Sequence, residues 1–371
     1  MGGCWPTPQQ EWLLRAALLP GDDAVRFWEV WKSQVDFNNL DWGSYRLLPL
    51  LYRNLRAHRV QDPWLDKLKG IYRHTWLKNQ LLFREMLYLL QAFHQAGIQT
   101  MILKGVPLIV LYLKDYGLRP MNDFDVLIRS KDLNQAAGLL AEWKWKPKFR
   151  APHAWGFITT KGNEFDLHWH VLAECCEVDA DDDFWEAAIP MQIAGFETRA
   201  LNATDQLLHV CIHGVAWNAI APIRWIADAI EILNASEIDW TRLVSQAQQR
   251  HLTLSLSASL GYLHRLFDAP IPEKVLKEVS ALPVSRVERL DYEAKTSVPN
   301  ERGAFLAAWA YYREYRRSVE GKTWAYKLVA FPGFLRTLWG LDHDWQVPVF
   351  AAVGAAKRIW KTLRTSFRTP P

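Results

Sequence analysis

The amino-acid sequence predicts an α+β protein in which a small mixed sheet lies between two large helical regions. In the first 97 residues, and again beyond residue 202, apolar side chains recur at helical spacing, as Leu47, Leu51 and Leu55 do. In the part between them, short runs alternate apolar and polar residues, which is typical of strands. The change of period along the chain therefore indicates where the sheet begins and ends.

The N-terminal region is predicted to hold a helix over residues 45–58 and a longer one over residues 64–96, with a candidate break at Gly70. Glycine favours the C-terminal end of a helix, so Gly97 is expected to end the second one. Beyond residue 202, helices are expected at 204–218, 222–235, 239–250 and 252–267.

The central region is predicted to alternate strands with short helices. Strands are expected at 98–103, 122–128, 145–149, 155–159 and 164–171, and helices at 105–112 and 131–142. A short helix and a hairpin around Gly195 are expected within 181–200. We therefore predict three parts: an N-terminal helical region (1–97), a catalytic core that holds the sheet (98–200) and a C-terminal helical region (201–371).

Composition narrows the class of protein. Hydrophobic residues make up 50% of the chain and charged residues 23%, a normal globular mix. A net charge of +4 suits an anionic ligand and does not require a long nucleic-acid track. The 4 cysteines form no CxxC pair, and no apolar run has the length of a membrane span. We therefore expect a cytoplasmic protein without a disulfide framework.

The run Asp123-Phe124-Asp125-Val126 is the most informative part of the sequence. Alternate residues of a strand share a face, so the two aspartates point the same way while Phe124 and Val126 face the core. The later run EFDLH offers Asp166. If the two strands are neighbours, three carboxylates converge, which suits two Mg²⁺ ions in phosphoryl transfer. An exposed polar strand face is the alternative, because a DxD pattern alone is weak.

A phosphate-binding turn is predicted ahead of these aspartates. Lys104 and Gly105 stand where a strand ends and a helix begins, so free amide groups, a bare backbone and a positive charge meet there. A surface lysine and a simple turn are the alternatives. Arg119 either grips a phosphate or pairs with the aspartates.

Histidines suggest further sites, each with a plainer alternative. His168 and His170 share a strand face with Asp166, which allows a zinc site, or a role for His168 in orienting Asp166 or contacting substrate. His209 and His213 are one helical turn apart, so they either line a substrate pocket or pack between helices, one of them reaching a buried carboxylate.

Three charged segments have structural interpretations. Arg224 and Asp228, one helical turn apart, are expected to pair, and Asp228 is also the carboxylate that one of those histidines would reach. The acidic run 179–183 is expected to cap a helix over 184–188. The basic segment 355–369 is expected to form an amphipathic helix that packs on the core or contacts an anionic surface, lipid or RNA.

Taken together, these motifs resemble a known family. The run LKGVPLIVLYLKDYGLRPMNDFDVLI, followed by EFDLHWHV, is similar to the uncharacterised nucleotidyltransferase family within the DNA polymerase β superfamily. The shared features are a Leu-Lys-Gly, an Arg-Pro-x-x-Asp-x-Asp and a later Asp-Leu-His-Trp. The stretch APIRWIADAIEIL resembles the helical half of the family, so the resemblance covers roughly residues 40–280.

The resemblance implies a polymerase β-like nucleotidyltransferase sheet and the use of a nucleoside triphosphate (NTP). By that match, Asp123, Asp125 and Asp166 are catalytic ligands of two Mg²⁺ ions, for which Mn²⁺ can substitute, while Lys104 and Gly105 belong to the nucleotide loop. Many superfamily members carry Gly-Ser or Gly-Gly in this loop, nearer to the aspartates, whereas here the pair is Lys-Gly and Gly105 precedes Asp123 by 18 positions.

The implied reaction is transfer of a nucleoside monophosphate from an NTP such as ATP to an acceptor, with release of pyrophosphate. Two rival functions use the same fold. One is a kinase-like transfer of the γ-phosphoryl group, and the other is a non-catalytic nucleotide-binding or antitoxin-type partner protein. No motif indicates whether the acceptor is a small molecule, a peptide, a protein or RNA.

Overall fold

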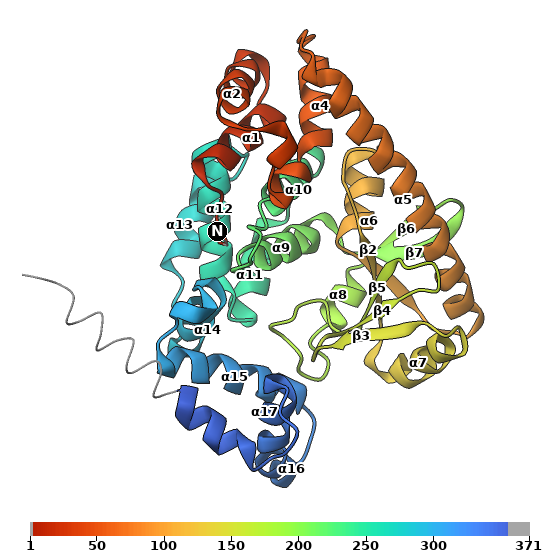
Figure 1. Cartoon of the computed structure of the whole chain (residues 1–371), viewed down its shortest axis with the longest axis vertical. Helices are drawn as coiled ribbons and strands as arrows, with labels where there is room; N and C mark the ends of the chain where they lie inside the picture. The colour runs from red at the N-terminus through yellow and green to blue at the C-terminus, as the bar shows by residue number, and fades with distance from the viewer. Residues whose placement is uncertain (1–2, 355–371) are drawn as a thin grey trace, which may run out of the picture.

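A computed structural model describes residues 3–354 and contains one seven-stranded mixed sheet with helices around it (Figure 1). The strands are β1 (Thr100–Leu103), β2 (Asp123–Ile128), β3 (Lys146–Arg150), β4 (Ala154–Ile158), β5 (Glu164–His168), β6 (Ile189–Ile193) and β7 (Phe196–Ala200). Their order across the sheet is β3-β4-β5-β2-β1-β7-β6. Pairs β2–β5 and β1–β7 are parallel and the others antiparallel. The predicted α+β class is confirmed.

Strand β2 separates two hydrophobic cores. Phe124 and Val126 belong to the core that the sheet forms with α5 (Trp64–Gln95) and α7 (Leu133–Glu142). Leu127 belongs to the other core, on the opposite face of the sheet. Because side chains alternate along a strand, the carboxylates of β2 lie on the same face as Leu127. The alternation predicted for this strand is confirmed.

Helices from both ends of the chain form this other core together. They include α1 (Pro8–Leu18), α4 (Leu48–Ala57), α9 (Ala203–Gly214), α10 (Arg224–Ala235) and α12 (Thr253–Phe267). The ring of Trp5 lies 6.0 Å from that of Trp225, and the Tyr262 hydroxyl donates a hydrogen bond of 3.0 Å to Glu11. Segments on either side of the sheet in sequence therefore share one core, and the division at residues 97 and 200 stays a prediction.

The described chain has further α-helices, and residues 346–354 are helical as well. They are α2 (Gly21–Gln34), α3 (Trp42–Tyr45), α6 (Gly105–Pro107), α8 (Asp182–Glu186), α11 (Trp240–Gln249), α13 (Glu273–Ala281), α14 (Arg286–Thr296), α15 (Ala304–Ser318), α16 (Trp324–Val329) and α17 (Phe331–Trp339). None of the helices within residues 3–354 is both long and apolar enough to cross a membrane. The predicted basic helix at 355–369 lies outside the described residues.

Several predicted helices differ from those observed. The helix expected over 45–58 is α4, which begins only at Leu48, because Pro49 in its first turn has no N–H to continue a preceding turn. The helix expected over 204–218 is α9, which ends at Gly214. Helix α5 runs unbroken through Gly70, so the candidate break there was wrong. A single interior glycine costs only about 0.5–1 kcal/mol, which a long packed helix tolerates. The helix expected over 105–112 is the short α6, followed by a π-helix over Leu108–Leu113.

Helices α9 and α10 are in close contact at Gly214. A Cβ atom at this position would lie 2.1 Å from Cγ of Trp225, whereas one at Gly138, on the exposed side of α7, meets nothing within 4 Å. We therefore expect Gly214→Ala to lower the free energy of unfolding by about 1–3 kcal/mol through overpacking. Gly138→Ala should raise it by about 0.4–1 kcal/mol. Urea unfolding of both variants checks this, and equal effects would contradict the packing described.

Candidate functional site

The pairing of β2 with β5 brings two carboxylates together. In this parallel pair, Asp125 is opposite Asp166 and Asp123 is opposite Glu164. Asp125, Asp166 and His168 each offer a ligand atom, and these atoms lie within 4.8 Å of one another. Asp123 is two positions before Asp125 on the same face and stands outside this tight group. The neighbouring strands that the sequence analysis assumed are therefore present.

Lys104 supplies the positive charge beside these carboxylates. Its ammonium pairs with Asp125 and lies 3.4 Å from Nε2 of His168, and the same ring nitrogen lies 3.0 Å from Oδ1 of Asp125. Lys104 follows β1 directly, in a backbone conformation with φ +52° and ψ −114° that side chains disfavour. Such strain costs about 1–3 kcal/mol and is common at functional sites.

The carboxylates differ in their pKa values. Burial would raise the pKa of Asp125, but Lys104 and His168 outweigh it and hold this pKa well below its usual range. Burial and the neighbouring Asp125 raise the pKa of Asp166 to about 6. They also raise the pKa of Asp123. Lys104 thus compensates one carboxylate, and a divalent cation would compensate the others.

The donor atoms fit a hard divalent cation. Carboxylate oxygens predominate over the single imidazole, and Mg²⁺ and Mn²⁺ prefer oxygen ligands. The zinc site considered for His168 and His170 is not formed, because Nδ1 of His170 lies 2.7 Å from Asp181 instead. His168 contacts Asp125 rather than orienting Asp166 through a hydrogen bond.

A cavity of about 220 Å³ borders the carboxylates, between the start of β2 and helices α9 and α10. Asp123, Asp125, Lys104, Gly105 and Arg119 all line it. Three larger cavities, of about 930, 1020 and 390 Å³, lie elsewhere on the described structure, and Asp123 and Asp125 line none of them. Asp166 lines neither these cavities nor the small one. We therefore take the small cavity as the candidate active site.

Gly105 is required by its neighbours. A Cβ atom there would lie 2.4 Å from Nη1 of Arg119 and 2.5 Å from the sulfur of Met121. The predicted role of this glycine was a close approach of phosphate to the backbone. The structure adds that a larger residue would push Arg119 out of its place beside the cavity.

Arg119 is buried and pairs with Asp228 rather than with Asp123 or Asp125. Its Nε and Nη2 atoms each lie 2.9 Å from a carboxylate oxygen of Asp228, on α10. The predicted pairing of Arg224 with Asp228 is not formed, because Arg224 donates a hydrogen bond of 2.6 Å to the carbonyl oxygen of Pro120. Both contacts tie α10 to the loop that precedes β2.

The histidines of α9 line the cavity. Their rings are stacked with centroids 6.1 Å apart. Burial, with Lys104 nearby, lowers the pKa of His209 to about 3 and that of His213 well below its usual value, so both rings are neutral at neutral pH. The predicted contact of one ring with Asp228 is not formed, because Asp228 is taken by Arg119.

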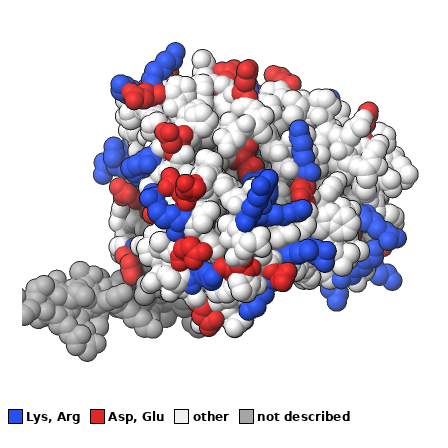
Figure 2. Space-filling model, turned by 90° about the horizontal axis from the view of Figure 1, so that it is seen from above, with Lys and Arg blue, Asp and Glu red and all other residues white. Residues whose placement is uncertain are grey.

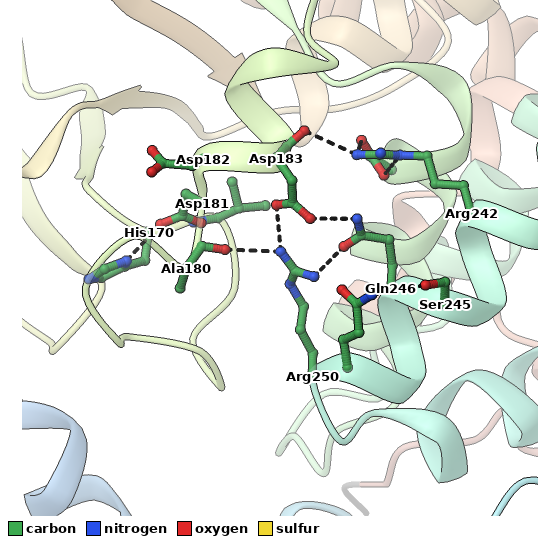
Figure 3. Close-up of polar contacts among 12 residues, drawn as sticks. His170, Ala180, Asp181, Asp182, Asp183, Arg242, Ser245, Gln246 and Arg250 are labelled. Carbon is green, nitrogen blue, oxygen red and sulfur yellow. Dashed lines mark hydrogen bonds and ion pairs between the residues drawn. The ribbon is translucent and has the colours of Figure 1, made fainter.

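The acidic run 179–183 is structural in a different way from the capping predicted (Figure 3). No side chain caps the N-terminus of α8. Asp181 instead accepts a hydrogen bond of 2.9 Å from the N–H of Val171, and Asp183 accepts one of 2.6 Å from Arg250. Asp181 thus closes the segment after β5 on itself, and Asp183 holds this segment against the end of α11.

Two cationic residues of the cavity were missed by the sequence analysis. Arg46, between α3 and α4, lines the cavity, and so does Arg224, for which only pairing with Asp228 had been predicted. Arg46 belongs to no motif and lies far from the aspartates in sequence. No local signal could have found it, since its position depends on the packing of the N-terminal helices.

Comparison with known proteins identifies the family. The model of a family described as "Uncharacterised nucleotidyltransferase" matches residues 44–268, more than half of the 371 residues, and the chain belongs to this family. No curated protein matches the chain in sequence.

Two solved structures were also found. The lincosamide antibiotic adenylyltransferase LnuA, bound to lincomycin, is 14% identical over 41% of this chain and 97% of its own, with a TM-score of 0.32. An antigenic nucleotidyltransferase-like protein from Paracoccidioides brasiliensis is 17% identical over 53% of this chain and 92% of its own, with a TM-score of 0.37. Neither superposition is close enough to support an argument about this chain.

The buried ion pair gives a testable prediction. We expect Asp228→Ala to lower the free energy of unfolding by about 3–5 kcal/mol, because it leaves the Arg119 guanidinium buried and unpaired. Asp23→Ala, which breaks the exposed pair with Arg26, should cost no more than about 1 kcal/mol. Chemical denaturation measures both. A loss at Asp228 as small as that at Asp23 would show that the buried pair does not stabilise the fold.

The raised pKa of Asp166 predicts a dependence on pH in metal-free protein. The folded-state pKa of Asp166 is about 6, above its ordinary value of 3.8. The stabilising contribution of the protonated carboxyl is therefore complete below about pH 4 and is lost as pH rises through 6. Asp166→Asn should therefore stabilise the protein by about 1–3 kcal/mol at pH 7.5 and hardly at all at pH 4.

Unfolding in EDTA at the two pH values measures this difference. The exposed Asp66→Asn serves as the control. The same change at both pH values for Asp166→Asn would show that its carboxyl is not under the electrostatic stress described.

Proposed function

We propose that this protein transfers a nucleoside monophosphate from an NTP to an acceptor, releasing pyrophosphate, at a divalent-metal site on Asp125 and Asp166. The observation that carries the proposal is the in-register pairing of β2 with β5, which joins these carboxylates at a cavity that Asp125 lines. Membership of the nucleotidyltransferase family supports the same chemistry.

The residues would divide the work between metal binding and phosphate binding. Asp125 and Asp166 would hold one Mg²⁺ ion, and Asp123 with Asp125 a second. Bound metal supplies charge neutralisation for the phosphates and a lower pKa for the attacking hydroxyl. The contact of His168 with Asp125 keeps that carboxylate in place.

Phosphate contacts would come from the residues that face the same cavity. Lys104 and Arg119 supply positive charge, and Gly105 leaves the backbone bare between them. Asp166 is the candidate to accept the proton of the acceptor hydroxyl. Most of the rate enhancement would arise from positioning and charge stabilisation, as in other phosphoryl transfers.

The acceptor is a separate question. Over the face of the molecule seen in Figure 2, Lys and Arg side chains are intermingled with Asp and Glu side chains. That face therefore offers no continuous basic track of the kind that a long nucleic acid requires. A small molecule, a peptide, a protein side chain or an RNA end all fit the proposal.

The direct test is incubation with each NTP and Mg²⁺, alone and with cell extract. We expect pyrophosphate release and transfer of label from the α-phosphate. Asp125→Asn and Asp166→Asn should each lower the rate roughly 100- to 1,000-fold, the usual effect of losing electrostatic stabilisation of the transition state. Asp66→Asn, on the exposed side of α5, should leave the rate unchanged.

Other products would identify the rivals. Transfer of label from the γ-phosphate, with a nucleoside diphosphate as product, would indicate a kinase. Full biological activity of the Asp125→Asn protein would indicate a non-catalytic partner protein. Absence of both turnover and binding with every NTP would contradict the proposal as a whole.

A further inference from the structure

Three arginines from distant parts of the chain meet in the small cavity. Arg46 comes from the junction of α3 and α4, Arg119 from the loop before β2 and Arg224 from the first residue of α10. Lys104 lines the cavity as well, so four cationic side chains share it with three carboxylates, those of Asp123, Asp125 and Asp228.

Each guanidinium is held in place by the protein. Arg119 is fixed by its two bonds to Asp228, and Arg224 by its bond of 2.6 Å to the carbonyl oxygen of Pro120. The guanidinium of Arg46 lies over the ring of Trp42, 5.9 Å from its centroid. The three forks are therefore positioned before any ligand arrives, which lowers the entropy cost of binding.

The negative charges of the cavity neutralise this group only in part. Asp228 is engaged with Arg119 and Asp125 with Lys104, while the carboxylate of Asp123 offsets part of the charge of Arg46 and Arg224. Burial, together with repulsion from Arg119 and Arg46, lowers the pKa of Arg224 to about 9. Burial and the charge of Arg119 likewise lower the pKa of Arg46. Crowded and partly desolvated guanidinium groups are stabilised by an anion placed between them.

We propose that Arg46, Arg119 and Arg224 bind the β- and γ-phosphates of the nucleoside triphosphate. This inference rests on the proposed nucleotidyl transfer and extends it. Guanidinium groups suit phosphate oxygens as charged hydrogen-bond donors, and all three share a cavity with the proposed metal ligands Asp123 and Asp125. Because Asp228 occupies the fork of Arg119, paired hydrogen bonds to phosphate would come from Arg46 and Arg224, and Arg119 would contribute mainly its charge. A volume of about 220 Å³ is smaller than that of pockets for whole drug-sized ligands, so it suits a polyphosphate chain.

The active site is then built from all three parts of the chain. Arg46 belongs to the N-terminal helices and Arg224 to the C-terminal helices, whereas the metal ligands lie on the sheet. The stacked rings of His209 and His213 line the same cavity on α9. Both histidine rings are uncharged, so the phosphates would bind at the arginines rather than along α9.

Equilibrium binding without any acceptor tests the proposal. The probes are inorganic tripolyphosphate, ATP, AMP and orthophosphate, each with Mg²⁺, measured by calorimetry. Arg46→Ala and Arg224→Ala should each weaken tripolyphosphate and ATP binding roughly 10- to 100-fold, as expected for lost charged hydrogen bonds. AMP binding should change less than about twofold, because AMP lacks the two phosphates concerned.

Two further variants serve as controls. Arg56→Ala removes an exposed arginine of α4 outside the cavity and should bind every probe like the wild type. Arg224→Lys keeps the charge but loses the fork, so it should be weaker than the wild type and tighter than Arg224→Ala. Thermal unfolding of each variant shows whether the fold is intact, and Arg224→Lys keeps the test valid if Arg224→Ala unfolds.

Several results would overturn the assignment. Unchanged tripolyphosphate affinity in Arg46→Ala and Arg224→Ala would show that these arginines do not bind polyphosphate. Equal weakening of AMP and ATP, or orthophosphate binding as tight as that of tripolyphosphate, would indicate a site for a single phosphate, such as that of a phosphorylated acceptor. Failure of nucleotidyl transfer itself is a separate outcome, because it would appear as absent pyrophosphate release with polyphosphate binding intact.

Discussion

The register between β2 and β5 is the constraint on which the site depends. It places the carboxylate of Asp125 beside that of Asp166, on the face of the sheet that borders the cavity. A shift of one residue in either strand would send its acidic side chains into the core formed with α5 and α7. The apolar residues Phe124 and Phe165, stacked with ring centroids 5.0 Å apart on that side, oppose such a shift. Packing on one face of the sheet thus fixes the placement of charge on the other.

The neighbouring carboxylates repel each other, and the positive charges of the protein compensate this repulsion only in part. Lys104 is brought to Asp125 by a strained backbone at the end of β1, where Leu103 is opposite Asp125 in the antiparallel pair. One ammonium group cannot neutralise the remaining carboxylates, as the raised pKa of Asp166 shows. The metal-free site therefore keeps an unmet demand for positive charge, which is the physical basis for expecting a divalent cation.

The sequence was sufficient for those features that depend on local periodicity. Alternation along β2 placed Asp123 and Asp125 on one face, and the later EFDLH run correctly supplied Asp166 on a neighbouring strand. It also placed Lys104 at the end of a strand. These predictions succeeded because a strand repeats every two residues whatever its tertiary context.

Pairings between distant residues could not be predicted in this way. Asp228 was assigned to Arg224 or to a histidine on spacing along α10, but it is bound by Arg119, 109 positions away. Helical periodicity indicates which face is buried and says nothing about what covers it. The same limit explains why Arg46 was missed and why Asp181 and Asp183, expected as helix caps, bind His170 and Arg250 instead.

The loop before β2 connects the locally determined strand to the long-range contacts of the helices. On one side, the side chain of Asn79, on α5, donates hydrogen bonds of 2.7 and 2.8 Å to the carbonyl oxygens of Tyr116 and Arg119. On the other side, α10 binds the loop through Asp228 and Arg224. The start of β2 is thus held by helices from both ends of the chain, so the position of Asp123 depends on their packing as well as on the sheet.

This arrangement gives the helical regions a direct part in shaping the candidate site. Helices that only covered the sheet would need no more than apolar contacts with the loop before β2. Instead, the contacts between α10 and this loop involve buried charged side chains. Burying a charge is costly unless a partner of opposite charge is present. Asp228 is that partner for Arg119, whereas Arg224 forms no ion pair within residues 3–354 and has the carboxylates of Asp228 and Asp123 only in its neighbourhood. A charge imbalance held rigidly beside the proposed metal ligands is what a site for an anionic substrate requires.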